Sequence, residues 1–276
     1  MSIATEQICV LVPTVFKNED WLKLTLESIR SQSRRVHIRI VGPYSDALSG
    51  LAAIYGAEFV VETGRSLSEA LNQGFEDLPR SVRYVSWIGD DDLLSPGSID
   101  RAFEALELHP DAPFAFGRVR YIDGLGRTKW LIRPGAWAVS YARWGHNFIA
   151  QQGSLIRLAS FGEVKGIDNT LRNSMDQDLF LKLSRIGRPR YIPSEQGAWR
   201  IHDASISSTK GGADEWRMVM RRYRPMVPRP IDMLATVFFR ITDRILLSVH
   251  CRIPGPGAAG VNGISYISTI HPDKLS

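Results

Sequence analysis

Short apolar stretches of strand length alternate with amphipathic stretches of helical length in the first part of the chain, and this alternation constrains the fold most. The first strand-like stretch, ICVLVPT, begins at Ile8, and the next stretch, NEDWLKLTLESIRSQ, has Leu22, Leu26 and Ile29 at helical spacing. The pattern repeats until RYVSWIG, which ends at Gly89. Such alternation predicts an α/β fold with a mostly parallel sheet, right-handed crossovers and helices on both faces.

The pattern changes after the next helix-like stretch, IDRAFEALEL. FAFGRVRYIDGLGRTKWLI alternates around Asp123-Gly124, which predicts an antiparallel hairpin. NSMDQDLFLKLSRIG predicts a late helix, with Ser174 and Gln177 at the spacing of a capping box. We therefore expect a main domain over residues 1–209, a basic helical extension over 210–252 and a flexible tail over 253–276.

The net charge of +5 comes from the predicted extension. Residues 1–209 carry 24 basic and 24 acidic side chains, whereas residues 210–252 carry 9 and 4. A neutral main domain argues against nucleic acid as a partner, because phosphate contacts require a spread of Lys and Arg over one face. Two cysteines exclude a disulfide framework, and the N-terminus carries no secretion signal. These features favour a cytoplasmic location.

The extension also contains an amphipathic pattern. Its apolar positions form one helical stripe, which consists of Ile231, Leu234, Phe238, Ile241, Ile245 and Val249. Charges at Arg240 and Asp243 argue against a membrane-spanning helix. A helix on the inner membrane surface, within residues 215–252, suits the pattern, with Arg221, Arg222, Arg224 and Arg229 at anionic lipid heads. Packing of this helix on the main domain, or on a second subunit of a homo-oligomer, is the open alternative.

Three adjacent carboxylates, Asp90, Asp91 and Asp92, directly follow the fourth strand-like stretch. They repel one another unless a cation or strong hydrogen-bond donors offset the charge. Mg²⁺ or Mn²⁺ prefers carboxylate oxygens and commonly bridges to a substrate diphosphate. A parallel sheet binds its ligands beyond the carboxyl ends of its strands, which favours a metal site here. The alternative is a solvated loop in which Asp92 or Ser95 caps the next helix.

Two other groups of residues carry chemistry. Asp176 and Asp178 lie about 200° apart on the late helix, so that one of them is expected to face a cleft as an ionised base. Arg200 and His202 alternate in an extended stretch and lie on the same side of it, where they can bind a diphosphate or a metal. Helix acids without a role, a surface Arg and a satisfied His are the alternatives.

Aromatic residues concentrate between residues 130 and 152. They are Trp130, Trp137, Tyr141, Trp144 and His146. Such rings stack on sugars, but they also pack under long loops, and the sequence favours neither role.

In their order along the chain, these motifs resemble the family 2 glycosyltransferases of the GT-A fold, from about Ile8 to Ser207. The resemblance implies a Rossmann-like catalytic domain, a nucleotide diphosphate sugar as donor, and Mn²⁺ or Mg²⁺. It also implies transfer of a hexosyl or deoxyhexosyl group, with inversion, to a saccharide or lipid-linked saccharide. The matching positions are Pro13, Thr14, Glu19, Asn72, Asp90, Asp91 and Arg200 for the donor, Asp92 and His202 for the metal, and Asp176 for the general base.

The chain departs from this family after the second strand, where VGPYSD replaces an acidic pair that reads the base. Tyr44, by stacking, is the alternative reader. A nucleotidyltransferase is a rival interpretation, although PTVFKNED lacks the glycines that usually cradle a triphosphate. A non-catalytic carbohydrate-binding module is another.

Overall fold

The computed structural model describes residues 6–145, 147–202 and 212–224, together with residues 234, 237, 238, 241, 242, 251 and 252. The predictions for His146, for Arg229, for residues 253–276 and for Ile231, Ile245 and Val249 of the apolar stripe lie outside the described residues.

The first part of the chain forms the alternating strands and helices that the sequence predicts. They are β1 (Ile8–Pro13), α1 (Glu19–Arg30), β2 (His37–Gly42), α2 (Asp46–Tyr55), β3 (Glu58–Val61), α3 (Leu67–Gly74), β4 (Tyr84–Trp87), β5 (Leu93–Leu94) and α4 (Ser98–Glu107). The parallel strands stand in the order β3-β2-β1-β4. The carboxyl ends of β1 and β4 are therefore neighbours.

The second part of the sheet is mixed. Its elements are β6 (Phe114–Ile122), β7 (Thr128–Ile132), α5 (Ala138–Tyr141), β8 (Leu155–Arg157), α6 (Leu158–Glu163), α7 (Met175–Ile186), β9 (Arg190–Arg200), α8 (Gly212–Tyr223) and β10 (Cys251–Arg252). The predicted hairpin is confirmed as the antiparallel pair β6 and β7. β8, which no sequence pattern predicted, lies between β4 and β6 and runs antiparallel to both. β9 pairs in parallel with β6 and antiparallel with β5.

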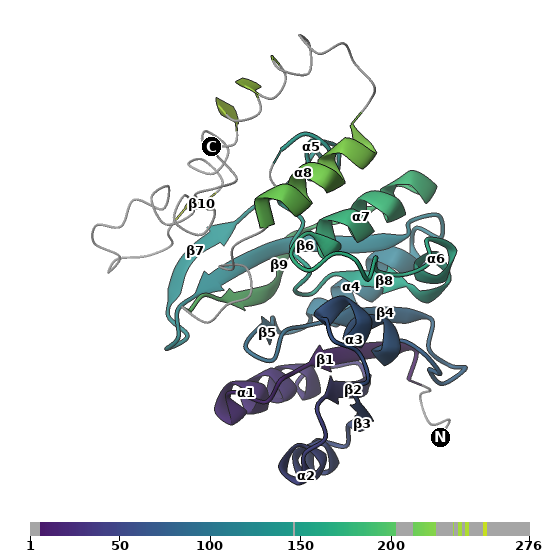
Figure 1. Cartoon of the computed structure of the whole chain (residues 1–276), viewed down its shortest axis with the longest axis vertical. Coiled ribbons are helices and arrows are strands. Elements are labelled where there is room, and N and C mark those ends of the chain that lie inside the picture. Colours follow the sequence, from purple (N-terminus) through teal and green to yellow (C-terminus); the bar gives the residue numbers. More distant parts are fainter. Residues whose placement is uncertain are drawn as a thin grey trace.

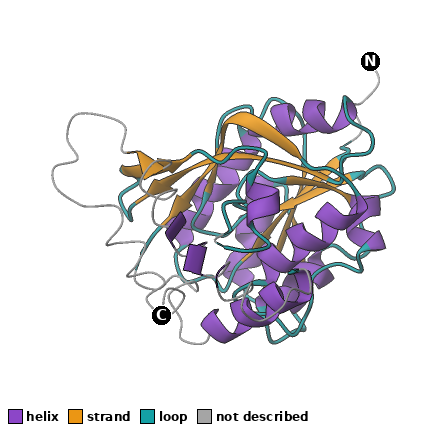
Figure 2. Ribbon diagram, turned by 90° about the horizontal axis from the view of Figure 1, so that it is seen from above, coloured by secondary structure: helices purple, strands orange, loops and turns teal. Residues whose placement is uncertain are grey.

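Helices cover both faces of the sheet, as predicted (Figures 1 and 2). Alternate residues of β1 enter two different cores. Ile8, Val10 and Val12 pack with residues of α1, α2 and α4, whereas Cys9 and Leu11 pack with residues of α3 and α7. A strand buried on both faces reads as a continuous apolar run, which explains the composition of β1.

The first helix of the predicted extension, α8, lies beside α7 (Figure 1). Val219, Met220 and Tyr223 are 0%, 2% and 8% exposed and belong to the same core as α7. In this stretch the structure agrees with the alternative of packing on the main domain. Among the helices in the described part of the chain, none combines the length and the hydropathy that crossing a bilayer requires.

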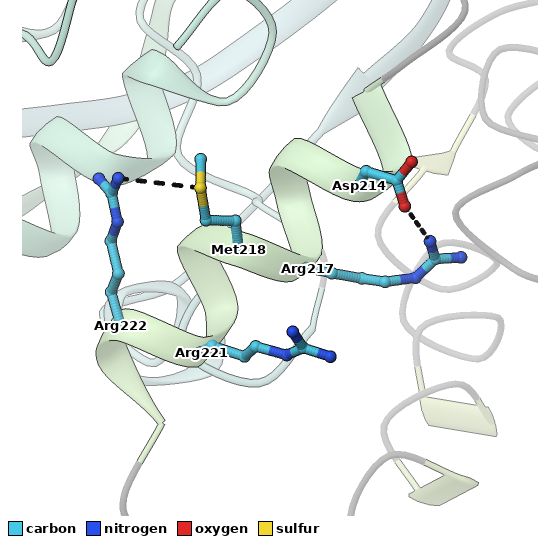
Figure 3. Close-up of a pocket in the computed structure, with 5 residues that line it drawn as sticks. All are labelled: Asp214, Arg217, Met218, Arg221 and Arg222. Atoms are coloured by element: carbon cyan, nitrogen blue, oxygen red, sulfur yellow. Dashed lines mark hydrogen bonds and ion pairs between the residues drawn. The ribbon is translucent and has the colours of Figure 1, made fainter. Parts of the chain in front are cut away.

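Two of the arginines expected at lipid heads make contacts within the protein instead. Arg222 forms ion pairs with Asp168 at 2.6 Å and with Asp178 at 3.2 Å. Arg224 donates to the Trp144 carbonyl at 2.9 Å. Arg221 lines a surface pocket of about 570 Å³ on α8 (Figure 3), whose other lining residues are Asp214, Arg217, Met218 and Arg222.

Candidate active site

The carboxyl ends of β1 and β4 open into a cavity of about 700 Å³. The loop after β1, the Asp-rich loop after β4, residues 147–152 and the beginning of α7 all contribute to its walls. Asp176 of α7 and the Asp-rich loop therefore line the same cavity, although more than 80 residues separate them in the chain.

Asp91 and His202 are in direct polar contact at this cavity. His202 Nε2 lies 2.7 Å from Asp91 Oδ2. The imidazole also packs against the ring of Trp21, with the ring centroids 4.8 Å apart. The structure thus brings two of the predicted site residues together, from the end of β4 and from just beyond β9.

Asp92, the predicted metal ligand, is 3% exposed and uses both carboxylate oxygens inside the protein. Gln152 Nε2 donates to Oδ2 at 2.8 Å, and the backbone N–H of Arg200 donates to Oδ1 at 2.8 Å. Burial, followed by the neighbouring charge of Asp91, raises the pKa of Asp92 well above its usual value. Asp92 thereby joins the Asp-rich loop to β9, and the geometry favours Asp91 as the partner of His202.

Asp90 is connected to the first strand. The Thr14 hydroxyl donates to Asp90 Oδ2 and accepts from the backbone N–H of Phe16. Burial raises the pKa of Asp90. Thr14 therefore holds the tips of β1 and β4 together at the cavity, next to Pro13, which lines it.

Arg200 lies beneath the Asp-rich loop instead of in the cavity. The residue is 2% exposed, and its Nε donates to the Asp91 carbonyl at 2.8 Å. Its Nη1 donates to the carbonyls of Asp123 and Gly124 at 3.1 and 3.3 Å, and its guanidinium lies 5.1 Å from the Trp21 ring centroid. The Nε and Nη1 donors of Arg200 are used on backbone carbonyls, and Arg200 is not among the residues that line the cavity.

Two other predicted donor residues lie outside the residues that line the cavity. Asn72 donates to the Ile167 carbonyl at 2.8 Å and to Asn169 at 2.6 Å, so that it fastens the loop after α6. Glu19 is paired with Lys23 at 2.6 Å on the surface of α1. The structure gives both residues local structural contacts and does not bring them to the site.

Asp176 and Asp178 face different surroundings, as their spacing predicts. Asp176 lines the cavity and accepts from Asn147 Nδ2 at 3.3 Å and from the backbone N–H of Gln177 at 2.7 Å. Asp178 is fully buried and forms an ion pair with Lys182 at 2.9 Å. Asp178 therefore belongs to the core, and Asp176 is the carboxylate available to a ligand.

Glu215 of α8 binds the segment directly before α7, and the predicted capping box is wrong. The Glu215 carboxylate accepts from the backbone N–H groups of Arg172, Asn173 and Ser174 at 2.5, 2.5 and 2.7 Å. The Ser174 side chain makes no cap bond, and its buried hydroxyl has no hydrogen-bond partner within the described residues. A carboxylate at this position satisfies three successive backbone donors and, because it lies at the N-terminal end of α7, complements the helix dipole.

The aromatic residues Trp130, Trp137, Tyr141 and Trp144, which the sequence singled out, are not among the residues that line the cavity. Trp130 is 4% exposed and stacks on Tyr121, and Trp137 packs against Phe148 with ring centroids 5.3 Å apart. Trp216 of α8, which was not among the predicted site residues, does line the cavity. A signal was present, because the apolar positions 216, 219, 220 and 223 have helical spacing.

Comparison with known proteins identifies the class. Residues 9–164 match the family described as glycosyl transferase family 2. Two relatives, both named uncharacterized glycosyltransferases, come from Rickettsia bellii and Rickettsia typhi and are 24% and 23% identical over 217 and 214 residues. The alignments cover 70% and 73% of this chain, but the chain spans only 31% and 66% of the relatives' length.

Solved structures agree on the fold. TarS of S. aureus, residues 1–349 in complex with UDP-GlcNAc, has a TM-score of 0.61 at 13% identity, over 84% of this chain and 71% of that one. A mannosyltransferase from Pyrobaculum calidifontis, in complex with GDP-Man and Mn²⁺, has a TM-score of 0.57 at 12% identity, over 99% and 82%. The fold is therefore the GT-A fold of glycosyltransferases. Within that class, the chain belongs to glycosyl transferase family 2.

Proposed function

We propose that this chain is a metal-dependent, inverting glycosyltransferase that moves a hexosyl or deoxyhexosyl group from a nucleotide diphosphate to a saccharide. One observation carries the proposal: the Asp91–His202 pair and Asp176 line one cavity of about 700 Å³. A cation site for a diphosphate and a carboxylate for an acceptor hydroxyl are the two centres that such a transfer requires.

The residues at the cavity suit a divalent cation whose remaining ligands the donor diphosphate would supply. Asp91 offers a carboxylate and His202 an imidazole, with the carboxylate of Asp90 nearby. In the described part of the chain, no three His, Cys, Asp or Glu side chains gather as a metal cage. Mg²⁺ and Mn²⁺ sites of this kind take one or two protein ligands and fill other positions with substrate phosphates. When bound, the ion supplies Lewis acidity for the leaving diphosphate.

The structurally similar proteins support a nucleotide sugar as the donor. TarS is seen with UDP-GlcNAc, and the mannosyltransferase with GDP-Man and Mn²⁺. Both are donors with a nucleoside diphosphate leaving group. We extend that donor class, and not a particular base or sugar, to this chain.

The chain's own residues provide the base and its orientation. Asp176 takes the proton of the acceptor hydroxyl as the oxygen bonds to the anomeric carbon. The bond from that carbon to the diphosphate breaks, and the diphosphate leaves with the electron pair on the opposite face, which inverts the configuration. Asn147 and the backbone N–H of Gln177 hold the two Asp176 oxygens. Arg200 fixes the main chain of Asp91.

A hydrolysis assay tests the proposal. A panel of nucleotide sugars is incubated with and without Mn²⁺, and release of the nucleotide diphosphate is measured; slow, metal-dependent hydrolysis of at least one donor is expected. Asp176→Asn should lower transfer by about 10²–10⁴-fold with donor binding retained. Asp91→Asn should weaken Mn²⁺-dependent donor binding, and Asp111→Asn, which changes an exposed carboxylate on another part of the surface, should alter neither.

Three results would count against this function. They are the absence of hydrolysis for every donor, full transfer activity in Asp176→Asn, and release of pyrophosphate from a nucleoside triphosphate and a sugar phosphate. The last result would identify a nucleotidyltransferase, and binding of saccharides without any turnover would identify a carbohydrate-binding module.

A lipid-linked acceptor and contact with the inner membrane surface are a further part of the proposal. Leu234, Val237, Phe238 and Ile241 are 68%, 49%, 59% and 56% exposed, and Arg221 is exposed on α8. Exposed apolar side chains that follow a basic helix in the chain favour anionic lipid. Sedimentation with phosphatidylglycerol vesicles should be strong, salt-sensitive and weakened by Phe238→Glu, with phosphatidylcholine vesicles as the control. Equal binding to both lipids, or to neither, would contradict it.

A further inference from the structure

We propose that α8 carries the acceptor subsite: the Trp216 ring is the platform on which the acceptor sugar lies, and Glu215 fixes this platform to the segment that carries Asp176. The inference rests on the proposed glycosyl transfer and adds to it a residue that determines acceptor binding. Trp216 lines the cavity together with the Asp-rich loop and Asp176.

Among the large aromatic side chains that line the cavity, Trp216 is the best placed for an acceptor. Trp21 packs against the imidazole of the Asp91–His202 pair and thus belongs to the donor end. Trp87 and Tyr121 are 3% and 7% exposed, and Trp199 packs against Tyr121 with ring centroids 4.9 Å apart. Trp216 is partly exposed and comes from a helix outside the sheet.

The position of the ring is fixed relative to the base. Glu215, the residue before it, accepts from three successive backbone N–H groups directly before α7, on which Asp176 lies in the first turn. At the other end of α8, the Tyr223 hydroxyl donates to Asp178 Oδ1 at 2.9 Å. Both ends of α8 are therefore fastened to the helix that carries the base.

The chemistry favours the acceptor over the donor as the occupant of this place. A general base must lie within hydrogen-bond reach of the hydroxyl that it deprotonates, so that the acceptor sugar has to lie at the α7 end of the cavity. An indole presents a broad apolar face and one N–H donor, which suits a ring that has an apolar C–H face and hydroxyls at its edge. A partly exposed Trp that lines the same cavity as the base and is tied to its helix through Glu215 meets both requirements.

The test compares Trp216→Ala and Trp216→Phe with Trp144→Ala. Trp144 contacts the end of α8 through Arg224 but lies outside the cavity, so that this variant is a matched loss of an indole. The probes are p-nitrophenyl glycosides of glucose, galactose, N-acetylglucosamine and rhamnose. For each glycoside, both its KM as an acceptor and its inhibition of acceptor-free donor hydrolysis are measured.

For Trp216→Ala, the acceptor KM, or the inhibition constant where no transfer occurs, should rise about tenfold. Donor hydrolysis without a glycoside and the thermal shift with nucleotide diphosphate should stay within about twofold of the original protein. Trp216→Phe should have most of the original protein's affinity for the glycosides, and Trp144→Ala should have all of it. Glu215→Ala should raise the acceptor KM and lower kcat for transfer, whereas Asp214→Ala, which removes only the exposed pair with Arg217, should change neither.

The outcomes separate the inference from the function on which it rests. If the original protein hydrolyses no donor, the proposed function fails and the inference fails with it. If donors are hydrolysed but Trp216→Ala leaves every glycoside constant unchanged, or no glycoside either accepts or inhibits, the inference alone is overturned. An equal loss of glycoside affinity in Trp144→Ala would also overturn the inference, because the effect would then come from a loosened α8 helix.

Discussion

Replacing Glu215 with Ala should destabilise the protein more than any change at the predicted cap of α7. The Glu215 carboxylate accepts three backbone N–H groups at 2.5, 2.5 and 2.7 Å. Each such bond contributes roughly 1 kcal/mol net, and more where the acceptor is charged. Because Glu215 is only partly buried, we take the lower figure and expect a loss of about 3 kcal/mol in the free energy of unfolding. For a chain of this size that corresponds to roughly 6–12 °C in Tm.

Urea and thermal unfolding, followed by circular dichroism, measure this loss. Ser174→Ala is the matched control, because it removes the hydroxyl that the sequence pattern assigns to the cap and that makes no cap bond in the structure. It should cost less than about 0.5 kcal/mol, whereas a functioning Ser cap is worth about 1 kcal/mol. Glu215→Gln, which keeps one carbonyl acceptor, should fall between the two. A cost for Ser174→Ala equal to that of Glu215→Ala would refute the reasoning.

Three other predictions follow from single residues. Burial raises the pKa of Asp168, but hydrogen bonds from Thr170 and Arg222 outweigh it and lower the pKa to about 2, so that its stabilisation is present above pH 4 and is lost as the pH falls toward 2. Asp168→Asn should flatten the acid limb of a plot of Tm against pH. Gly153→Ala should cost more than about 2 kcal/mol in urea unfolding, because φ is +73° and the new Cβ would lie 2.4 Å from a backbone oxygen of β9. Burial raises the pKa of the Cys9 thiol to about 12, so that iodoacetamide should modify Cys9 only after unfolding, as peptide mass mapping would show.

Local patterns were sufficient for most of the fold. Hydrophobic periodicity located the strands and helices up to β4, the hairpin of β6 and β7, and α7, because each pattern depends on residues that are close in sequence. β8 escaped because it is three residues long and pairs with strands that are distant in the chain. The rule for strand ends and the family resemblance assigned the Asp-rich loop and Asp176 to the site of one enzyme, and both line the same cavity.

The detailed roles within the site depended on contacts that no local pattern contains. Which of the three adjacent aspartates is buried depends on β9, whose Arg200 N–H binds Asp92 across 108 residues. That contact turns Asp92 toward the interior and leaves Asp91 beside His202. A sequence pattern identifies the three carboxylates only as a group. It contains no information on which strand will lie beside them, and so it cannot distinguish them. Replacement of Asp92 and of Asp91 should therefore differ in kind: the first should lower stability, the second metal-dependent binding.

In the predicted extension, the net charge of the segment does not determine which contact holds its first helix in place. Residues 210–252 carry an excess of basic side chains, and that excess predicted an anionic partner. Yet α8 is held at the candidate active site by an acid, because this acid meets backbone N–H donors just before the N-terminus of α7, and these favour a carboxylate whatever the net charge of α8. Net charge acts over a surface, whereas one well-placed carboxylate acts on a single helix end. Screening by salt should therefore weaken any binding of this segment to anionic vesicles and leave the contact of Glu215 with α7 nearly unchanged.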